Sequence, residues 1–129
     1  MALDKENENQ AYLCGRLFAV LEKLQQDASS SKLNRTIKDA YFASAASKPM
    51  LVFPKLIILS QNHLKKVKSP VFYSILIQEI VGKLTGGFPD TLLLKDQGRF
   101  IVGYYQQYQS FFEKSNNKNE TEEEENGTE

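Results

Sequence analysis

The chain has 129 residues, of which 41% are hydrophobic and 25% charged, and its 16 Lys and Arg residues balance its 16 Asp and Glu residues. This length favours one domain, and the hydrophobic content is too high for a wholly disordered protein. The longest mostly apolar runs, such as 71–77, are far shorter than the ~18 residues needed to span a bilayer. These values predict a soluble globular protein with a single core.

Cysteine content and targeting features predict an intracellular protein. The one cysteine, Cys14, excludes a disulfide within the chain and a cysteine-rich zinc site. No charged and then apolar leader with a small-residue cleavage site follows Met1. We therefore expect a cytoplasmic protein with no membrane partner, and we interpret the glycosylation patterns at Asn34, Asn119 and Asn126 as chance matches.

The zero net charge conceals a strong asymmetry along the chain. Residues 115–129 contain one Lys and six Glu, and residues 1–8 contain one Lys and three acids, which leaves 14 basic and 7 acidic residues in 9–114. The last segment has too few apolar groups to offset the entropy of ordering it. We therefore predict a disordered N-terminus over 1–8, a folded basic domain over 9–114 and a disordered acidic tail over 115–129.

The first two predicted helices differ in their apolar residues. The first covers about 8–26, because four leucines recur on one face at spacings of four, four and three. These are Leu13, Leu17, Leu21 and Leu24. Hydroxyl side chains at 29–31 end this helix, and the second is expected at about 33–46. Small residues at 43–47 suggest a place where another backbone approaches closely.

Two prolines mark the starts of the third and fourth helices, because proline is tolerated in the first turn of a helix. The third is expected at about 50–66, just after Pro49. The fourth is expected at about 70–84, with Ser69 as its N-cap and Pro70 in its first position. Its apolar run also fits a strand, but a length of nearly a dozen residues favours a buried helix.

Aromatic residues define the fifth predicted helix, which covers about 96–114. Seven apolar positions fall on one broad stripe. They are Phe100, Ile101, Tyr104, Tyr105, Tyr108, Phe111 and Phe112. The three tyrosines could stack on bases, but their helical spacing favours packing in a core or between subunits. The preceding leucines at 92–94 fit either a turn or a short helix. Since no alternating runs joined by tight turns occur, we predict an all-α fold, a single bundle of about five helices.

No residue pattern supports catalysis, a metal site or a cofactor. The only histidine, His63, has no carboxylate at a helical spacing to position it as a general base. Cys14 lies among apolar residues and is expected to be a buried side chain rather than a nucleophile. Glycine-rich phosphate loops and paired carboxylate motifs are absent from the sequence. We therefore predict that the protein is not an enzyme.

Positive charge is the strongest functional signal. Residues 28–78 contain eight Lys or Arg residues and one acid, Asp39. Helical spacing places Lys55 and Lys66 on one face of the third helix, and two further basic residues share a face of the second. Rows of this kind attract nucleic-acid phosphates without reading bases. The predicted nucleic-acid-binding residues are Arg35, Lys38, Lys48, Lys55, Lys65 and Lys66.

Other interpretations of these residues remain open. Scattered lysines are also typical of an ordinary solvated surface. Lys48, beside a proline, could be a free loop lysine, and Arg35 could pair with Asp39 four residues later, in a surface ion pair worth ~0.3–0.5 kcal/mol.

Five strings over about 12–112 resemble the C-terminal region of the large subunit of the type I-C CRISPR interference complex. The strings are Asn34-Arg35-Thr36-Ile37, Tyr41-Phe42-x-x-Ala45, Val52-Phe53-Pro54-x-Leu56, Asn62-His63-Leu64 and Gly98-Arg99-Phe100-x-x-Gly103-Tyr104-Tyr105-x-Gln107. In that family the same region is also translated separately from a start inside the gene, as the small subunit of the Cascade complex. A chain of this length resembles that small subunit.

The resemblance implies a non-catalytic helical bundle that helps to assemble Cascade and stabilises the R-loop. Its implied protein partners are the large subunit, the backbone subunits and further copies of itself. The implied nucleic-acid partner is target DNA, including the displaced strand, with CRISPR RNA contacted only indirectly. The rival hypothesis is a purely protein-binding helical scaffold whose basic face meets acidic surfaces of other subunits.

One departure from the family pattern concerns the last helix. The family often continues its Gly-Tyr-Tyr motif with His, Gln and Arg, whereas this chain has Gln106, Gln107 and Tyr108. Because the expected positive charge is missing, we assign no nucleic-acid contact to this helix and leave Arg99 out of the predicted site.

Overall fold

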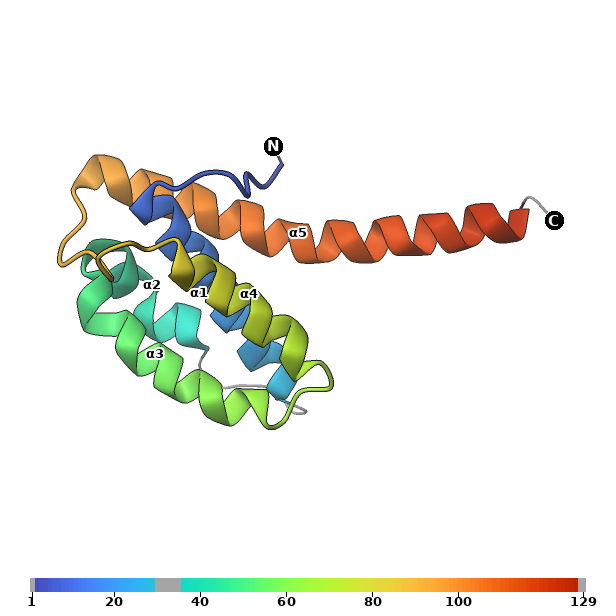
Figure 1. The fold of residues 1–129 in the computed structure, drawn as a ribbon, viewed down its shortest axis with the longest axis horizontal. Helices are drawn as coiled ribbons and strands as arrows, with labels where there is room; N and C mark the ends of the chain where they lie inside the picture. Colours follow the sequence, from blue (N-terminus) through green and yellow to red (C-terminus); the bar gives the residue numbers. More distant parts are fainter. Residues whose placement is uncertain (1, 30–35, 128–129) are drawn as a thin grey trace.

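The computed structural model describes residues 2–29 and 36–127, with the side chains of this part placed as far as residue 113. Five helices and no strand occur in these residues (Figure 1), which confirms the predicted all-α bundle. The helices are α1 (Gln10–Ala28), α2 (Ile37–Ser47), α3 (Pro49–Leu64), α4 (Pro70–Gly82) and α5 (Leu94–Gly127).

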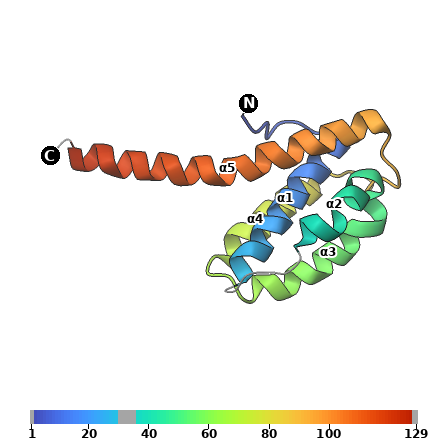
Figure 2. The same cartoon turned by 180° about the vertical axis from the view of Figure 1, so that it is seen from behind.

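Helix α1 is the centre of the bundle. It packs against each of the other four helices, and every residue from 11 to 22 is buried. Figures 1 and 2 show α1 with α4 on one side and α2 on the other, and α5 crosses it near its N-terminal end. The leucine stripe predicted for this helix is confirmed, since all four leucines have at most 2% of their surface exposed.

Aromatic rings fill the space between α1 and its neighbours. Phe18 is fully buried, and its ring packs edge-to-face against four other rings at centroid distances of 5.4 to 6.3 Å. These rings belong to Phe42 of α2, Phe53 of α3, and Phe100 and Tyr104 of α5. One side chain therefore contacts the cores of three other helices, which makes Phe18 the main packing residue of the fold.

The predicted helix starts agree closely with the structure. Pro49 and Pro70 occupy the first turns of α3 and α4, where their missing N–H groups leave no hydrogen bond unmade. Ser69 is the N-cap residue of α4, as predicted, although its hydroxyl makes no capping hydrogen bond. After α4, the chain turns at Gly86 and Gly87, whose φ angles are 89° and 87°.

The fifth helix is longer than predicted. The sequence predicts an end near residue 114 and a disordered tail beyond it, whereas the backbone of α5 continues as a helix to Gly127. Glutamate and lysine are good helix formers, and no proline or glycine interrupts the segment before Gly127. In Figure 1 this end of α5 projects away from the other four helices. The division of the chain at residue 114 into a bundle and a tail stays a prediction.

The N-terminal segment before α1 forms no helix but contacts the bundle. The Asp4 amide donates a hydrogen bond to the Tyr12 hydroxyl oxygen at 2.9 Å, and Lys83 Nζ donates one to the Lys5 carbonyl oxygen. Leu3 is half-buried. Residues of this segment therefore contact α1 and the C-cap residue of α4, while the disorder predicted for 1–8 stays a prediction.

Two glycines allow α1 and α5 to approach at backbone distance. A Cβ atom on Gly15 would lie 2.0 Å from the carbonyl oxygen of Phe100, and one on Gly103 would lie 2.2 Å from that of Tyr12. The sequence suggested a close approach at 43–47 instead. Ala45 and Ala46 there are buried, but these two α1–α5 contacts depend on glycines that the sequence pattern did not identify.

Cys14 lies in this core and has no exposed surface. Burial raises the pKa of its thiol to about 12, so that little reactive thiolate exists at pH 8. We expect iodoacetamide at pH 8 to leave Cys14 unmodified in the native protein for as long as the urea-unfolded protein needs for complete alkylation. Mass spectrometry measures both samples, and equal rates of alkylation would contradict the burial of Cys14.

Candidate nucleic-acid interface

Four of the six predicted binding residues are exposed along α3 and at its ends. Lys48 is the residue between α2 and α3, Lys55 lies on the outer side of α3, Lys65 follows its last residue, and Lys66 lies in the turn beyond. A helix of 16 residues is about 24 Å long, so these exposed lysines are spread over the length of α3 and both of its ends. We call Lys48, Lys55, Lys65 and Lys66 the α3 lysine row.

Lys38 does not extend this row. Its side chain is half-buried, and Nζ lies 5.1 Å from the ring centroid of Tyr104 and 5.3 Å from that of Tyr105. Cation–π attraction therefore directs the ammonium group toward α5 rather than over α3. Lys38 therefore does not lie with the α3 lysine row, and Arg35, the other predicted residue of the second helix, lies outside the described residues.

Lys38 is also close to a buried carboxyl group. Glu22 on α1 accepts a hydrogen bond of 2.5 Å from the Tyr104 hydroxyl. Burial raises the pKa of Glu22, while this hydrogen bond and the positive charge of Lys38 act in the opposite direction. Lys38 therefore stabilises the bundle interior, a role that helical spacing alone could not distinguish from phosphate binding.

A turn between α3 and α4 adds a basic residue that the predicted set omits. Lys66, Lys68 and Ser69 line a hollow of about 490 Å³ in front of the first turn of α4. No side chain caps the first turn of α4, so the positive end of its dipole is not neutralised there. The predicted set omits Lys68, which lies in the turn between α3 and α4, where helical spacing gives no signal. Asp27 also borders the hollow, where it accepts a hydrogen bond of 3.0 Å from Lys23.

The outer side of α3 is not purely basic. Leu51 and Ile58, one turn before and one turn after Lys55, are 64% and 70% exposed. Large apolar side chains exposed this far are typical of surfaces that contact another protein. The face that carries the α3 lysine row therefore combines features of a phosphate-binding surface and of a protein interface.

His63 lies on α3 with its side chain half-buried. Burial and the positive charge of Lys66 both lower its pKa, which favours the neutral imidazole. No hydrogen bond or ion pair joins its side chain to a carboxylate among the described residues. In the same part of the chain, no three His, Cys, Asp or Glu side chains come together as metal ligands.

The tyrosines of α5 differ in their surroundings. Tyr104 is buried, and Tyr108 is half-buried with its hydroxyl donating to Gln26 Oε1 at 3.2 Å. Packing is therefore confirmed for these two residues. Tyr105 is 53% exposed and lies under Lys38. Polar residues of α1 and α5 that the sequence did not single out also pair in the core, as Arg16 Nε does with Gln107 Oε1 at 2.9 Å.

Comparison with known proteins assigns the chain to a family. No helix within the described residues is long and apolar enough to cross a bilayer. No curated protein matches the chain. Residues 1–112 match the family of CRISPR-associated proteins called Cas_Csd1. This range contains α1 to α4 and the part of α5 up to Phe112. The chain therefore belongs to the Cas_Csd1 family of CRISPR-associated proteins.

Proposed function

We propose that this chain is the non-catalytic small subunit of a type I-C Cascade complex, in which it helps assembly and stabilises the R-loop. The observation that supports this most directly is the exposed α3 lysine row, on a domain with 14 basic and 7 acidic residues over 9–114. Family membership supplies the CRISPR context. The resemblance of its motifs to the C-terminal region of the type I-C large subunit supplies the subunit assignment.

The chemistry of this role needs charge and position but no reaction. In RNA-guided recognition, base pairing supplies sequence specificity, and protein contacts to the backbone stabilise the heteroduplex and the displaced strand. Ammonium groups of the α3 lysine row and Lys68 would bind phosphates of a strand lying along α3. Holding the displaced strand there disfavours its return to the duplex.

Exposed apolar side chains support the assembly part of the role. Leu51 and Ile58 lie on α3, and Ile101 and Val102 on α5 are 41% and 42% exposed. Surfaces of this composition fit contacts with the large subunit, the backbone subunits or further copies of the chain. The rival function, a scaffold without nucleic-acid contact, is favoured by Leu51 and Ile58, because these two residues lie on the same helix as the α3 lysine row.

Binding of single-stranded DNA by the isolated protein tests the phosphate contacts. With ~4 phosphates neutralised, the slope of log affinity against log salt should be about −3, and Lys66→Glu should make this slope less steep by about 0.7 or more. Lys95→Glu is the matched control, because Lys95 is an exposed lysine of α5 outside the row. Fluorescence anisotropy at several salt concentrations measures the slope, and equal effects of the two variants would contradict the proposed surface.

The double variant Lys55→Glu with Lys66→Glu separates the two functions. If the row binds phosphates, the complex should still assemble but open duplex target poorly. Loss of assembly, measured by size-exclusion chromatography of the co-expressed subunits, would instead favour the protein scaffold. Normal assembly together with normal R-loop formation would contradict both functions.

A further inference from the structure

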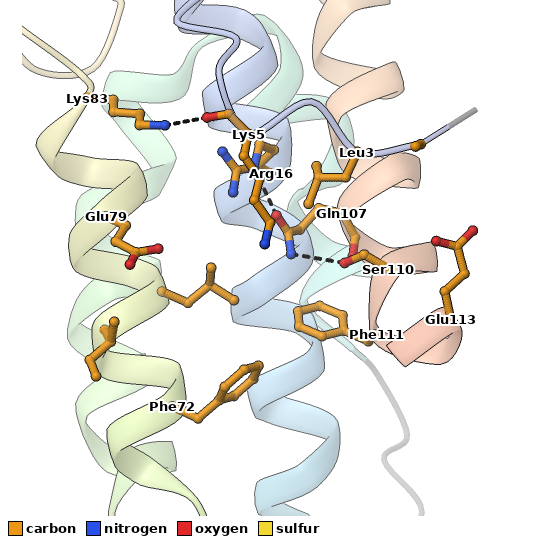
Figure 3. Close-up of a pocket in the computed structure, with 13 residues that line it drawn as sticks. Leu3, Lys5, Arg16, Phe72, Glu79, Lys83, Gln107, Ser110, Phe111 and Glu113 are labelled. Carbon is orange, nitrogen blue, oxygen red and sulfur yellow. Dashed lines mark hydrogen bonds between the residues drawn. The ribbon is translucent and has the colours of Figure 1, made fainter. Parts of the chain in front are cut away.

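A groove lies on a different side of the molecule from the α3 lysine row. It has a volume of about 610 Å³, and it lies between α4 and α5, with α1 as its floor (Figure 3). Leu3 and Lys5 of the N-terminal segment also line it. Apolar side chains line much of both walls, including Ile75 and Leu76 of α4 and Phe111 of α5. Ile75 is 52% exposed, so the groove leaves a large apolar side chain in contact with solvent.

A buried arginine forms part of the floor. Arg16 is only 3% exposed, and Figure 3 shows its side chain between the two walls. Its Nε donates a hydrogen bond of 2.9 Å to Gln107 Oε1, while its two Nη atoms have no hydrogen-bond partner among the described residues. Asp4 and Glu79 act on its charge from a distance, but neither forms an ion pair with it.

The two Nη atoms of this guanidinium group reach the surface of the groove, because no fully buried side-chain nitrogen or oxygen among the described residues lacks a hydrogen-bond partner. Removing a charged group from water is unfavourable unless an opposite charge and hydrogen bonds replace the water. Burial accordingly lowers the pKa of Arg16, although a guanidinium stays charged at neutral pH. A ligand that fits this groove therefore has a carboxylate or phosphate to pair with Arg16, with apolar groups beside it.

The apolar walls of the groove discriminate between possible occupants. The charged side chains of the lining are mixed, because Lys5, Arg16 and Lys83 lie there together with Glu79 and Glu113, so their charge alone does not select a partner. A nucleic-acid strand has no apolar side chains that could cover the apolar walls. Residues 115–129 of this chain, or of a second copy, contain no large apolar side chain and could not cover the apolar walls. A protein segment with several apolar side chains and one carboxylate satisfies both the walls and the floor.

We propose that the groove between α4 and α5 binds an amphipathic helix of a partner protein, and that an Asp or Glu of this helix pairs with Arg16. A helix laid between two helices over a third completes a four-helix arrangement, in which its apolar face covers Ile75 and Phe111. Its carboxylate accepts hydrogen bonds from the free Nη atoms. This docking site does not depend on nucleic-acid binding by the α3 lysine row.

Site-specific photo-crosslinking in the assembled complex tests the site. We place p-benzoylphenylalanine at Ile75, and at Gln78 as the control, because Gln78 is an exposed residue of the same helix outside the groove. The Ile75 probe should crosslink to one apolar helical segment of another subunit that contains an Asp or Glu, and the Gln78 probe should not. Crosslinking to nucleic acid, to a segment without a carboxylate, or equally from both positions would overturn the proposal.

A synthetic peptide of the crosslinked segment then tests the role of Arg16. Replacing the acidic residue of the peptide by its amide should weaken binding to the native protein by about tenfold or more. The same replacement should have no effect on binding to Arg16→Gln, and an equal loss in both proteins would overturn the pairing. If Arg16→Gln is unfolded by circular dichroism, Ile75→Ser should weaken binding of the peptide and Gln78→Ser should not, and equal binding by these two variants would overturn the site.

Discussion

Gly15→Ala is expected to lower the free energy of unfolding by about 3 kcal/mol or more, because its new methyl group has no space. A Cβ atom there would lie 2.0 Å from the carbonyl oxygen of Phe100 and 2.8 Å from the amide nitrogen of Tyr104. Both contacts are with backbone atoms, so no side-chain rotation can relieve them. The substitution must separate α1 from α5, and urea denaturation followed by circular dichroism measures the loss.

Two glycines of α5, Gly103 and Gly98, provide matched tests of this explanation. Gly103→Ala approaches the same contact from the other helix, at 2.2 Å from the Tyr12 carbonyl oxygen, and should be similarly destabilising. At Gly98 a Cβ atom would meet nothing within 4 Å, so Gly98→Ala should raise stability by ~0.5–1 kcal/mol through helix propensity. Equal stability of Gly15→Ala and Gly98→Ala would show that the α1–α5 contact is looser than described.

Phe18→Ala is expected to cost about 3–5 kcal/mol of the free energy of unfolding. The ring is fully buried and contacts aromatic rings of α2, α3 and α5, so its removal leaves a cavity that these helices must enclose together. Denaturant unfolding gives the loss of stability, and near-ultraviolet circular dichroism reports the loosened aromatic packing.

Phe112→Ala is the control for this prediction, since Phe112 is 48% exposed on α5. Its ring contacts Tyr108 at a centroid distance of 5.2 Å, but much of its surface already faces water. We expect a loss of less than about 1 kcal/mol. A comparable loss from both phenylalanine substitutions would contradict the central position of Phe18.

Local signals in the sequence were sufficient for most helix boundaries. Pro49 and Pro70 identified two helix starts because proline restricts only its own residue and its neighbours. The leucine spacing of α1 identified its buried face for a similar reason, since helix periodicity is independent of the packing partner. The predicted end of α5 near residue 114 was too early, because the prediction considered charge and burial but not the helix propensity of glutamate.

Features that depend on residues far apart in the chain could not be predicted. The spacing of Lys38 fixed its position on α2, but only packing against α5 brought its ammonium group over Tyr104. Arg16 and Gln107 pair across 91 positions of sequence, and neither residue type indicates a buried partner. Glycine in a helix is usually a weak point, so Gly15 and Gly103 gave no sign that they allow two backbones to meet.

The pairing of the first helix with the last has a consequence for synthesis of the protein. During translation α1 leaves the ribosome before α5, whose aromatic residues cover it. The core can therefore close only after α5 has been synthesised, and contacts of such long sequence separation slow folding. A nascent chain that ended before Leu94 would expose the apolar face of α1, which would make it a substrate for chaperones and proteases rather than a smaller functional domain.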